Sequence, residues 1–136
     1  MKLDTSSPRS LGPLPEVGPL AFGHWRFVGH DVRTATHLIE TALDLGMNLI
    51  DTADVYGLDW GGEGFGDAES LLGSVLAASP ELRERMVLAS KGGIMPGIPY
   101  DSSRRYLTEA LDSSLTRLSV DRIDLYQIHR PDMFTH

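Results

Sequence analysis

Four polar residues of this chain have types and spacings that together could perform acid–base chemistry: Asp51, Tyr56, Lys91 and His129. A free tyrosine has a pKa of about 10, too high for ready proton exchange near neutrality. A lysine ammonium nearby favours the phenolate, and a carboxylate in contact with that lysine keeps it charged. A histidine beside the tyrosine can orient a carbonyl oxygen. Such a set suits reversible carbonyl reduction with a hydride from a cofactor, and it contains neither a nucleophile nor a metal site.

Each of the four residues also has an ordinary structural explanation. Asp51 could accept backbone hydrogen bonds in a turn, and Tyr56 could be a loop aromatic at a rim. Lys91 could lie on the surface, and His129 could be a satisfied core histidine. Their joint position favours function, because each lies at or just beyond the C-terminal end of a predicted strand, where parallel α/β assemblies bind their ligands.

The elements that must position these side chains are short apolar runs alternating with amphipathic segments. A stripe such as Ala35, Ile39 and Ala42 has helical spacing, and Asp31 can cap the start of that helix. A short strand that ends at Gly23 is predicted within 17–25, and further strands over 47–51, 86–91 and 123–129. Helices are predicted over about 31–45, 67–79 and 102–118, and glycine-rich loops over 56–66 and 92–99.

Alternating β/α units predict a parallel sheet with helices outside it. Strands start near residues 47, 86 and 123, so the units repeat after 39 and then 37 residues. A doubly wound open sheet and a (β/α)8 barrel both fit this pattern, and four units would be half of a barrel of about 250 residues. If Lys91 and His129 face inward, Ala89 and Gln127 share their face and Asp124 points away.

Three ordered segments carry a resemblance to a known family: NLIDTADVYG at 48–57, ASKGG at 89–93 and RIDLYQIHRPD at 122–132. They resemble the strand-two, lysine and histidine segments of the aldo-keto reductases, and the similarity extends from about Val17 to Asp132. The runs GHWR at 23–26 and HRPD at 129–132 resemble the bacterial predicted-oxidoreductase branch. The resemblance implies an α/β fold, the (β/α)8 TIM barrel. On this reading residues 1–16 are a flexible tail running into an extended segment, and 17–136 are the N-terminal half of the barrel, about four β/α units.

The resemblance also implies a role for each site residue. Tyr56 becomes the general acid/base, tuned by Lys91 and Asp51, and His129 orients the carbonyl. NADPH is the implied cofactor, an aldehyde or ketone is the implied small-molecule substrate, and no metal is needed. For Trp25, packing at the rim is an equal alternative to ligand contact. The residues implied near the cofactor are Gly23, His24, Trp25 and Asp51.

Two departures from the family pattern leave alternatives open. The loop GLDWGGEGFG at 57–66 is longer than the usual link after the tyrosine, and the later strands that supply most cofactor contacts have no counterpart here. We therefore expect a piece of a longer protein, or a chain that self-associates, inactive by itself. A non-catalytic NADPH-binding regulatory relative is the second hypothesis. A lyase that uses Lys91 as a Schiff base is the third, and it leaves the Asp51–Tyr56 spacing without a role.

The composition of the chain argues against several classes of protein. The formal net charge of −7 argues against a general nucleic-acid surface, which requires a basic stripe. There are no cysteines, so disulfides and thiolate metal sites are excluded. No apolar stretch approaches the roughly 18 residues of a membrane span, and the start of the chain has no apolar signal core. These features predict a cytoplasmic protein without nucleic-acid or membrane partners.

Overall fold

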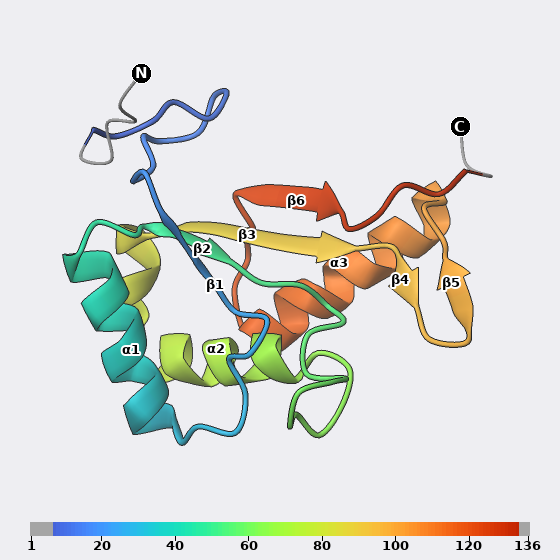
Figure 1. Cartoon of the computed structure of the whole chain (residues 1–136), viewed down its shortest axis with the longest axis horizontal. Helices are drawn as coiled ribbons and strands as arrows, with labels where there is room; N and C mark the ends of the chain where they lie inside the picture. Colours follow the sequence, from blue (N-terminus) through green and yellow to red (C-terminus); the bar gives the residue numbers. More distant parts are fainter. Residues whose placement is uncertain (1–6, 134–136) are drawn as a thin grey trace.

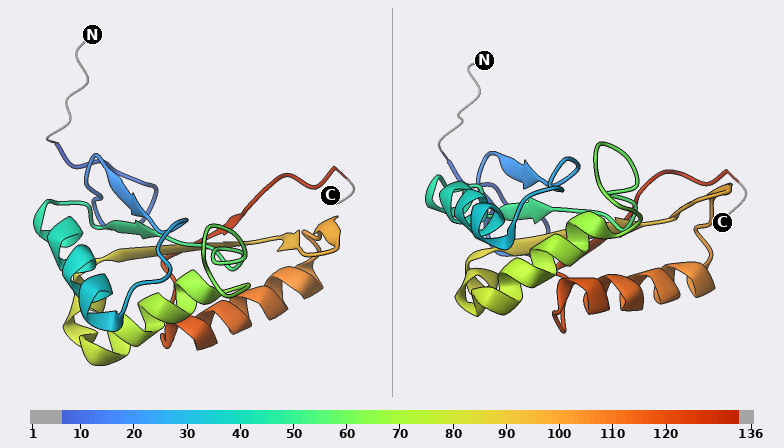
Figure 2. Two further views of the ribbon diagram at one scale, coloured as in Figure 1. Left: turned by 60° about the horizontal axis from the view of Figure 1, so that its bottom comes forward. Right: turned by 90° about the horizontal axis from the view of Figure 1, so that it is seen from below.

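The computed structural model describes residues 7–133, which form a four-stranded parallel sheet with three α-helices along one face (Figures 1 and 2). The strand order is β1-β2-β3-β6, so each β/α unit adds its strand beside the preceding one. A doubly wound sheet needs helices on both faces, whereas a barrel needs them only outside. The fold is therefore a half of a (β/α)8 barrel. The strands are β1 (Ala21–Gly23), β2 (Leu49–Asp51), β3 (Val87–Gly92) and β6 (Leu125–Ile128).

The register of the sheet aligns the polar ends of its strands. Gly23 of β1 is opposite Asp51 of β2, which in turn is opposite Ala89 of β3. Further along β3, Lys91 is opposite Gln127 of β6. Because all four strands are parallel, their C-terminal ends and the loops that follow lie at one end of the sheet (Figure 1).

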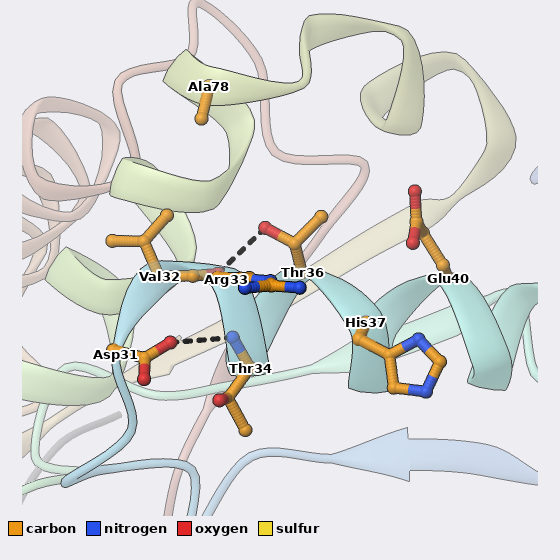
Figure 3. A pocket seen from close by; sticks show the side chains of 8 residues that line it. All are labelled: Asp31, Val32, Arg33, Thr34, Thr36, His37, Glu40 and Ala78. Carbon is orange, nitrogen blue, oxygen red and sulfur yellow. Dashed lines mark hydrogen bonds between the residues drawn. The ribbon is translucent and has the colours of Figure 1, made fainter.

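Helix α1 (Val32–Asp44) follows the predicted signals closely. The Asp31 carboxylate accepts a hydrogen bond of 2.7 Å from the Thr34 amide, which satisfies one free N–H of the first turn (Figure 3). The helix ends before Gly46, whose φ of +81° is readily adopted only by glycine and reverses the chain. The buried face of α1 carries Ala35 and Ile39, so the predicted apolar stripe is confirmed.

Helices α2 (Asp67–Ala78) and α3 (Arg104–Leu118) pack tightly against each other. A Cβ at Gly73 would lie 2.1 Å from the carbonyl oxygen of Arg117, so only glycine permits this approach. Ser103 caps α3 by accepting a hydrogen bond from the Tyr106 amide. A 3-10 helix, η1 (Pro80–Arg85), follows α2 where the proline was expected to end the helix.

Two segments differ from the sequence-based expectation. The predicted loop over 92–99 contains an antiparallel hairpin of β4 (Ile94–Met95) and β5 (Ile98–Tyr100), turned by Gly97 at a φ of +84°. Within the tail that was predicted to be flexible, Arg9 pairs with Val17 through two backbone hydrogen bonds of 2.7 and 2.9 Å. The first part of that tail, residues 1–6, lies outside the described residues. Strands β2 and β6 are also shorter than expected, at three and four residues, whereas β3 keeps the expected six and is shifted by one.

One apolar core lies between the sheet and the helices. Ile50 of β2 and Leu88 of β3 are fully buried in it, together with side chains from all three helices. Asp124, expected to point away from the site, pairs with Arg83 at 2.9 Å and accepts the Leu88 amide, so it joins β6 to the base of β3. Over residues 7–133, every helix is too short or too polar to cross a membrane.

Candidate active site

Lys91 is the centre of the candidate site. Its ammonium donates to Asp51 Oδ2 at 2.7 Å, to the Thr52 carbonyl oxygen at 2.8 Å and to the Tyr56 hydroxyl at 3.1 Å. The same nitrogen lies 4.7 Å from the centroid of the Tyr56 ring. The predicted convergence of Asp51, Tyr56 and Lys91 is therefore confirmed. All three contacts are with oxygen atoms, so the nitrogen is engaged in an ion pair and hydrogen bonds and is not free to act as a Schiff-base nucleophile.

The segment after β2 holds Tyr56 in place through main-chain contacts. The Thr52 amide donates to the Ala89 carbonyl, and the Asp54 amide donates to the Lys91 carbonyl, so the backbone continues along β3 beyond the end of β2. The Tyr56 carbonyl then accepts the Ala68 amide from the first turn of α2. These bonds fix Tyr56 between the sheet and the N-terminus of α2, so that its hydroxyl stays in hydrogen-bond contact with the Lys91 ammonium.

His129 completes the predicted set from the fourth strand. Its amide donates to the Gly92 carbonyl at 2.8 Å, and its ring packs edge-on against Tyr56 with centroids 5.5 Å apart. Burial, together with the positive charges of Lys91 and Arg130, lowers the pKa of His129, and Asp51 opposes that shift only in part. The imidazole is therefore neutral near pH 7. Its buried Nδ1 has no hydrogen-bond partner within the described chain.

Gln127 is a site residue to which the sequence assigned no role. Its side-chain amide donates to Asp51 Oδ1 at 3.2 Å, so the two oxygens of Asp51 are held separately, one by Gln127 and one by Lys91. The two-residue period of a strand could have indicated this position, because Gln127 lies two residues before His129 and its side chain must point to the same face. What it contacts there follows from the register of β6 with β3.

A pocket of about 510 Å³ opens beside these groups. Tyr56 and His129 line it, whereas Asp51 and Lys91 are not among its lining residues. The tyrosine therefore separates the pocket from the ion pair, so that a substrate would meet a hydroxyl and an imidazole. A larger hollow of about 980 Å³ runs along the outer side of α1 and contains none of the predicted site residues (Figure 3).

The three residues predicted near the mouth of β1 have different surroundings. Gly23 lies in register with Asp51, and no atom lies within 4 Å of the position that a Cβ would take, so a ligand could approach its main chain. Trp25 is 52% exposed and lines the pocket. His24 has an exposed fraction of 0% and stacks on Phe27 with centroids 4.1 Å apart. Burial, and secondarily Lys91, lowers the pKa of His24 to about 3. His24 was predicted to lie near the cofactor or substrate, and its imidazole is enclosed by the described residues around it.

A buried polar cluster behind the site was also missed. The Glu69 carboxylate accepts the Ser90 hydroxyl at 2.5 Å and the Arg117 guanidinium at 2.8 Å, which links α2 to β3 and α3. Asp54 is fully buried beside it, and neither of its carboxylate oxygens has a hydrogen-bond partner among residues 7–133. Burial, and secondarily the charge of Glu69, raises the pKa of Asp54 to about 7. Sequence periodicity gives no signal for this cluster, because its members come from separate elements.

Comparison with known proteins finds relatives that match most of this chain. The chain is 59% identical over 122 residues to the 6-dehydroglucose reductase of Novosphingobium aromaticivorans, and the match covers 88% of the chain and 40% of that protein. It is 35% identical to the oxidoreductase YdhF of Escherichia coli, again over 87% of the chain and 40% of the relative. A solved Pseudomonas aeruginosa protein assigned to the aldo-keto reductases superposes with a TM-score of 0.75 at 34% identity, covering 95% of this chain and 48% of the other.

The chain thus spans about 40% of the length of the two curated relatives. The model of the aldo/keto reductase family matches residues 19–136, which include all four strands and all four predicted catalytic residues. The sheet and the grouping of Asp51, Tyr56 and Lys91 are present within the matched residues. Because the family model matches most of its length, the chain belongs to the aldo/keto reductase family.

Proposed function

We propose that the protein carrying this chain reduces an aldehyde or ketone to an alcohol with NADPH as the hydride donor, and that Tyr56 is its general acid/base. The observation that supports this most strongly is the contact of the Lys91 ammonium with both Asp51 and the Tyr56 hydroxyl, at 2.7 and 3.1 Å. The pocket on the other side of Tyr56 gives a carbonyl group access to that hydroxyl.

In the proposed mechanism the Tyr56 hydroxyl donates a proton to the carbonyl oxygen as the alcohol forms. The Lys91 ammonium stabilises the phenolate that remains, and Asp51 keeps Lys91 charged and oriented. Neutral His129 supplies a hydrogen bond that orients the carbonyl oxygen. In the reverse direction, the phenolate accepts the proton of an alcohol, so that one set of residues serves reduction and oxidation.

The side chains of the site fit a bound hydride donor, because a phenol, an ammonium, a carboxylate and an imidazole can move protons but not hydride. A nicotinamide cofactor supplies that hydride when bound, and the family points to NADPH. Among the residues here, Gly23, Trp25 and Asp51 would contribute to holding it. The main chain at Gly23 is open to a ligand, whereas the enclosed imidazole of His24 is not in that set.

For the substrate, we propose a sugar-derived aldehyde. The relative with 59% identity is named a 6-dehydroglucose reductase, which indicates a glucose derivative carrying a carbonyl group. The pocket mixes apolar side chains such as Ile94 and Met95 with the charged Asp59 and Arg130, a lining that suits a hydroxylated molecule better than a purely apolar one. A cytoplasmic location accords with the cysteine-free chain.

The test is carbonyl-dependent oxidation of NADPH by the complete protein that carries this chain, with NADH in parallel. Turnover of 6-dehydroglucose that depends on Tyr56 is the expected result. Tight NADPH binding without turnover of any aldehyde or ketone would instead support the regulatory alternative, in which the barrel binds the cofactor without reducing a substrate.

A further inference from the structure

Two exposed tryptophans and an arginine gather at the edge of the candidate pocket. Trp25 and Trp60 are 52% and 57% exposed, and their rings meet edge to face with centroids 5.6 Å apart. The Arg26 guanidinium lies over the Trp60 ring at 4.1 Å and lies 5.8 Å from the centroid of Trp25. This group, here called the indole platform, offers a ligand in the pocket a continuous aromatic surface.

The loop over 57–66 is built to hold Trp60 in this position. Trp60 has a φ of +64°, a left-handed conformation that is unfavourable for a bulky side chain. The loop closes on itself, because a Cβ at Gly62 would lie only 2.2 Å from the Gly57 carbonyl oxygen. The Glu63 amide donates to Asp67 Oδ2 at 3.1 Å, which ties the loop to the first turn of α2. A compact, tied loop thus keeps an exposed indole in a strained conformation, and such strain is retained where a functional position requires it.

The indole platform is continuous with the pocket that contains Tyr56 and His129. Trp25 lines that pocket, as does Asp59, the residue directly before Trp60. Across the pocket, the Arg130 guanidinium donates to the Tyr100 hydroxyl at 3.3 Å. A ligand that extends from the catalytic tyrosine toward Trp25 would therefore have an aromatic surface on one side and charged donors and acceptors at its edges.

We propose that Trp60, held by Arg26 against Trp25, is a specificity-determining residue that selects substrates carrying a hydroxylated ring, that is, sugar-type carbonyl compounds. The proposal rests on the carbonyl reductase function stated above and adds the feature that recognises the part of the substrate distant from the reacting carbonyl. The C–H face of a pyranose ring covers the exposed indoles, while the hydroxyl groups at the ring edge reach Asp59 and the arginine side chains.

Other ligand classes fit these residues less well. A purely aliphatic aldehyde would remove water from Asp59 and Arg130 without replacing its hydrogen bonds, which costs affinity. A strongly anionic ligand would be attracted to Arg26 and Arg130 but would be repelled by Asp59. A neutral, hydroxylated ring satisfies both the aromatic surfaces and the charged edges.

The experiment compares two aldehydes, 6-dehydroglucose and butanal, with the complete protein and the variants Trp60→Ala, Trp60→Gly and Trp60→Phe. Glycine accepts the left-handed backbone at this position, so Trp60→Gly separates loss of the indole from strain in the loop. Phe65→Ala is the matched control, because Phe65 belongs to the same loop but does not line the pocket, and its ring centroid lies 5.8 Å from the Arg117 guanidinium. D-glucose titration, followed by tryptophan fluorescence, provides a readout that needs no turnover.

We expect Trp60→Ala and Trp60→Gly to raise the KM for 6-dehydroglucose by about 5-fold or more, the scale of a lost aromatic contact, with kcat within about 2-fold. The kcat/KM for butanal should stay within about 2-fold, Trp60→Phe should recover part of the loss, and Phe65→Ala should resemble the wild type. D-glucose affinity should fall in the same order.

Equal effects on both aldehydes, or none on either, would overturn the role of Trp60 while leaving the reductase function standing. An effect of Trp60→Ala that is absent in Trp60→Gly would assign the change to the loop backbone and would also overturn it. Failure to turn over any carbonyl compound defeats the proposed function itself. In that case, D-glucose binding that depends on Trp60 would still support the platform, and its absence would overturn the platform as well.

Discussion

The ammonium of Lys91 lies 2.7 Å from the Asp51 carboxylate, and both side chains keep only a minor exposed fraction, 14% and 28%. A pair so shielded interacts more strongly than a surface pair, although the solvent that remains screens part of the attraction. The same ammonium donates to the Tyr56 hydroxyl, so the ion pair is in direct contact with the oxygen proposed to react.

Tyr56→Phe keeps the ring and removes the proton. In the complete protein, kcat for carbonyl reduction should fall by about 10²-fold or more, the scale of general acid catalysis, whereas the NADPH dissociation constant should change little. Steady-state kinetics and a fluorescence titration with NADPH measure the two quantities. Tyr106→Phe is the control, because the Tyr106 hydroxyl donates to the Ile94 carbonyl and does not line the pocket. Unaltered turnover in Tyr56→Phe would show that another group is the acid.

Lys91→Met removes the ammonium that stabilises the phenolate. The kcat for alcohol oxidation should fall more than the kcat for carbonyl reduction, because oxidation needs the phenolate as a base while reduction needs only the phenol. Paired pH–rate profiles in both directions measure this asymmetry. Identical losses in the two directions at every pH would contradict the assigned role.

Gln127 is expected to act as a positioning residue through Asp51. Gln127→Leu should lower kcat roughly 3- to 10-fold with KM nearly unchanged, since one hydrogen bond to a charged group is lost at 3.2 Å. Gln127→Glu places a second carboxylate beside Asp51 and should have a larger effect and a changed pH profile. A purely structural role would instead lower the thermal midpoint of both variants equally and leave the pH profile of kcat unmoved.

The buried carboxyl of Asp54 should make the free energy of unfolding depend on pH. Burial and Glu69 raise its pKa to about 7, whereas an aspartate in an unfolded chain titrates near 4. Between these values the folded protein holds a proton that the unfolded chain has lost, so the Asp54 contribution to the free energy of unfolding falls as the pH rises from about 4 to about 7. The loss should amount to a few kcal/mol at most, at a rate of about 1.4 kcal/mol for each pH unit between the two pKa values.

Asp54→Asn should abolish this part of the decline, because an amide fills the same space and does not titrate. The variant should therefore be more stable than the wild type at pH 8 and comparable to it near pH 4. Denaturant unfolding at a series of pH values measures the difference, and the exposed Asp121→Asn serves as the control. Parallel stability curves for Asp54→Asn and the wild type would show that Asp54 is not held protonated.

Much of the site could be predicted because its members are marked locally. Asp51, Lys91 and His129 each lie at the end of a mostly apolar strand segment, and the parallel order implied by alternating β/α units brings strand ends to one edge. Helix α1 shows the same local determination, since Asp31, the apolar stripe and Gly46 all act within a few residues of the backbone they shape. Signals of this kind depend on neighbours in the chain and can be read before any tertiary contact is known.

Tertiary structure alone decided which side chains meet across long separations. Gln127 and Asp51 are 76 residues apart, and the register of β6 with β3 brings them together. His24 follows a strand end like the other candidates, yet it is buried and stacks on Phe27, because a turn closed by the Phe27 amide and the His24 carbonyl brings the two rings together. Trp25 and Trp60 meet only because two loops close at the same rim. Periodicity and capping describe how each segment folds, whereas register, helix packing and loop closure set the distances between segments, and the chemistry of the site depends on those distances.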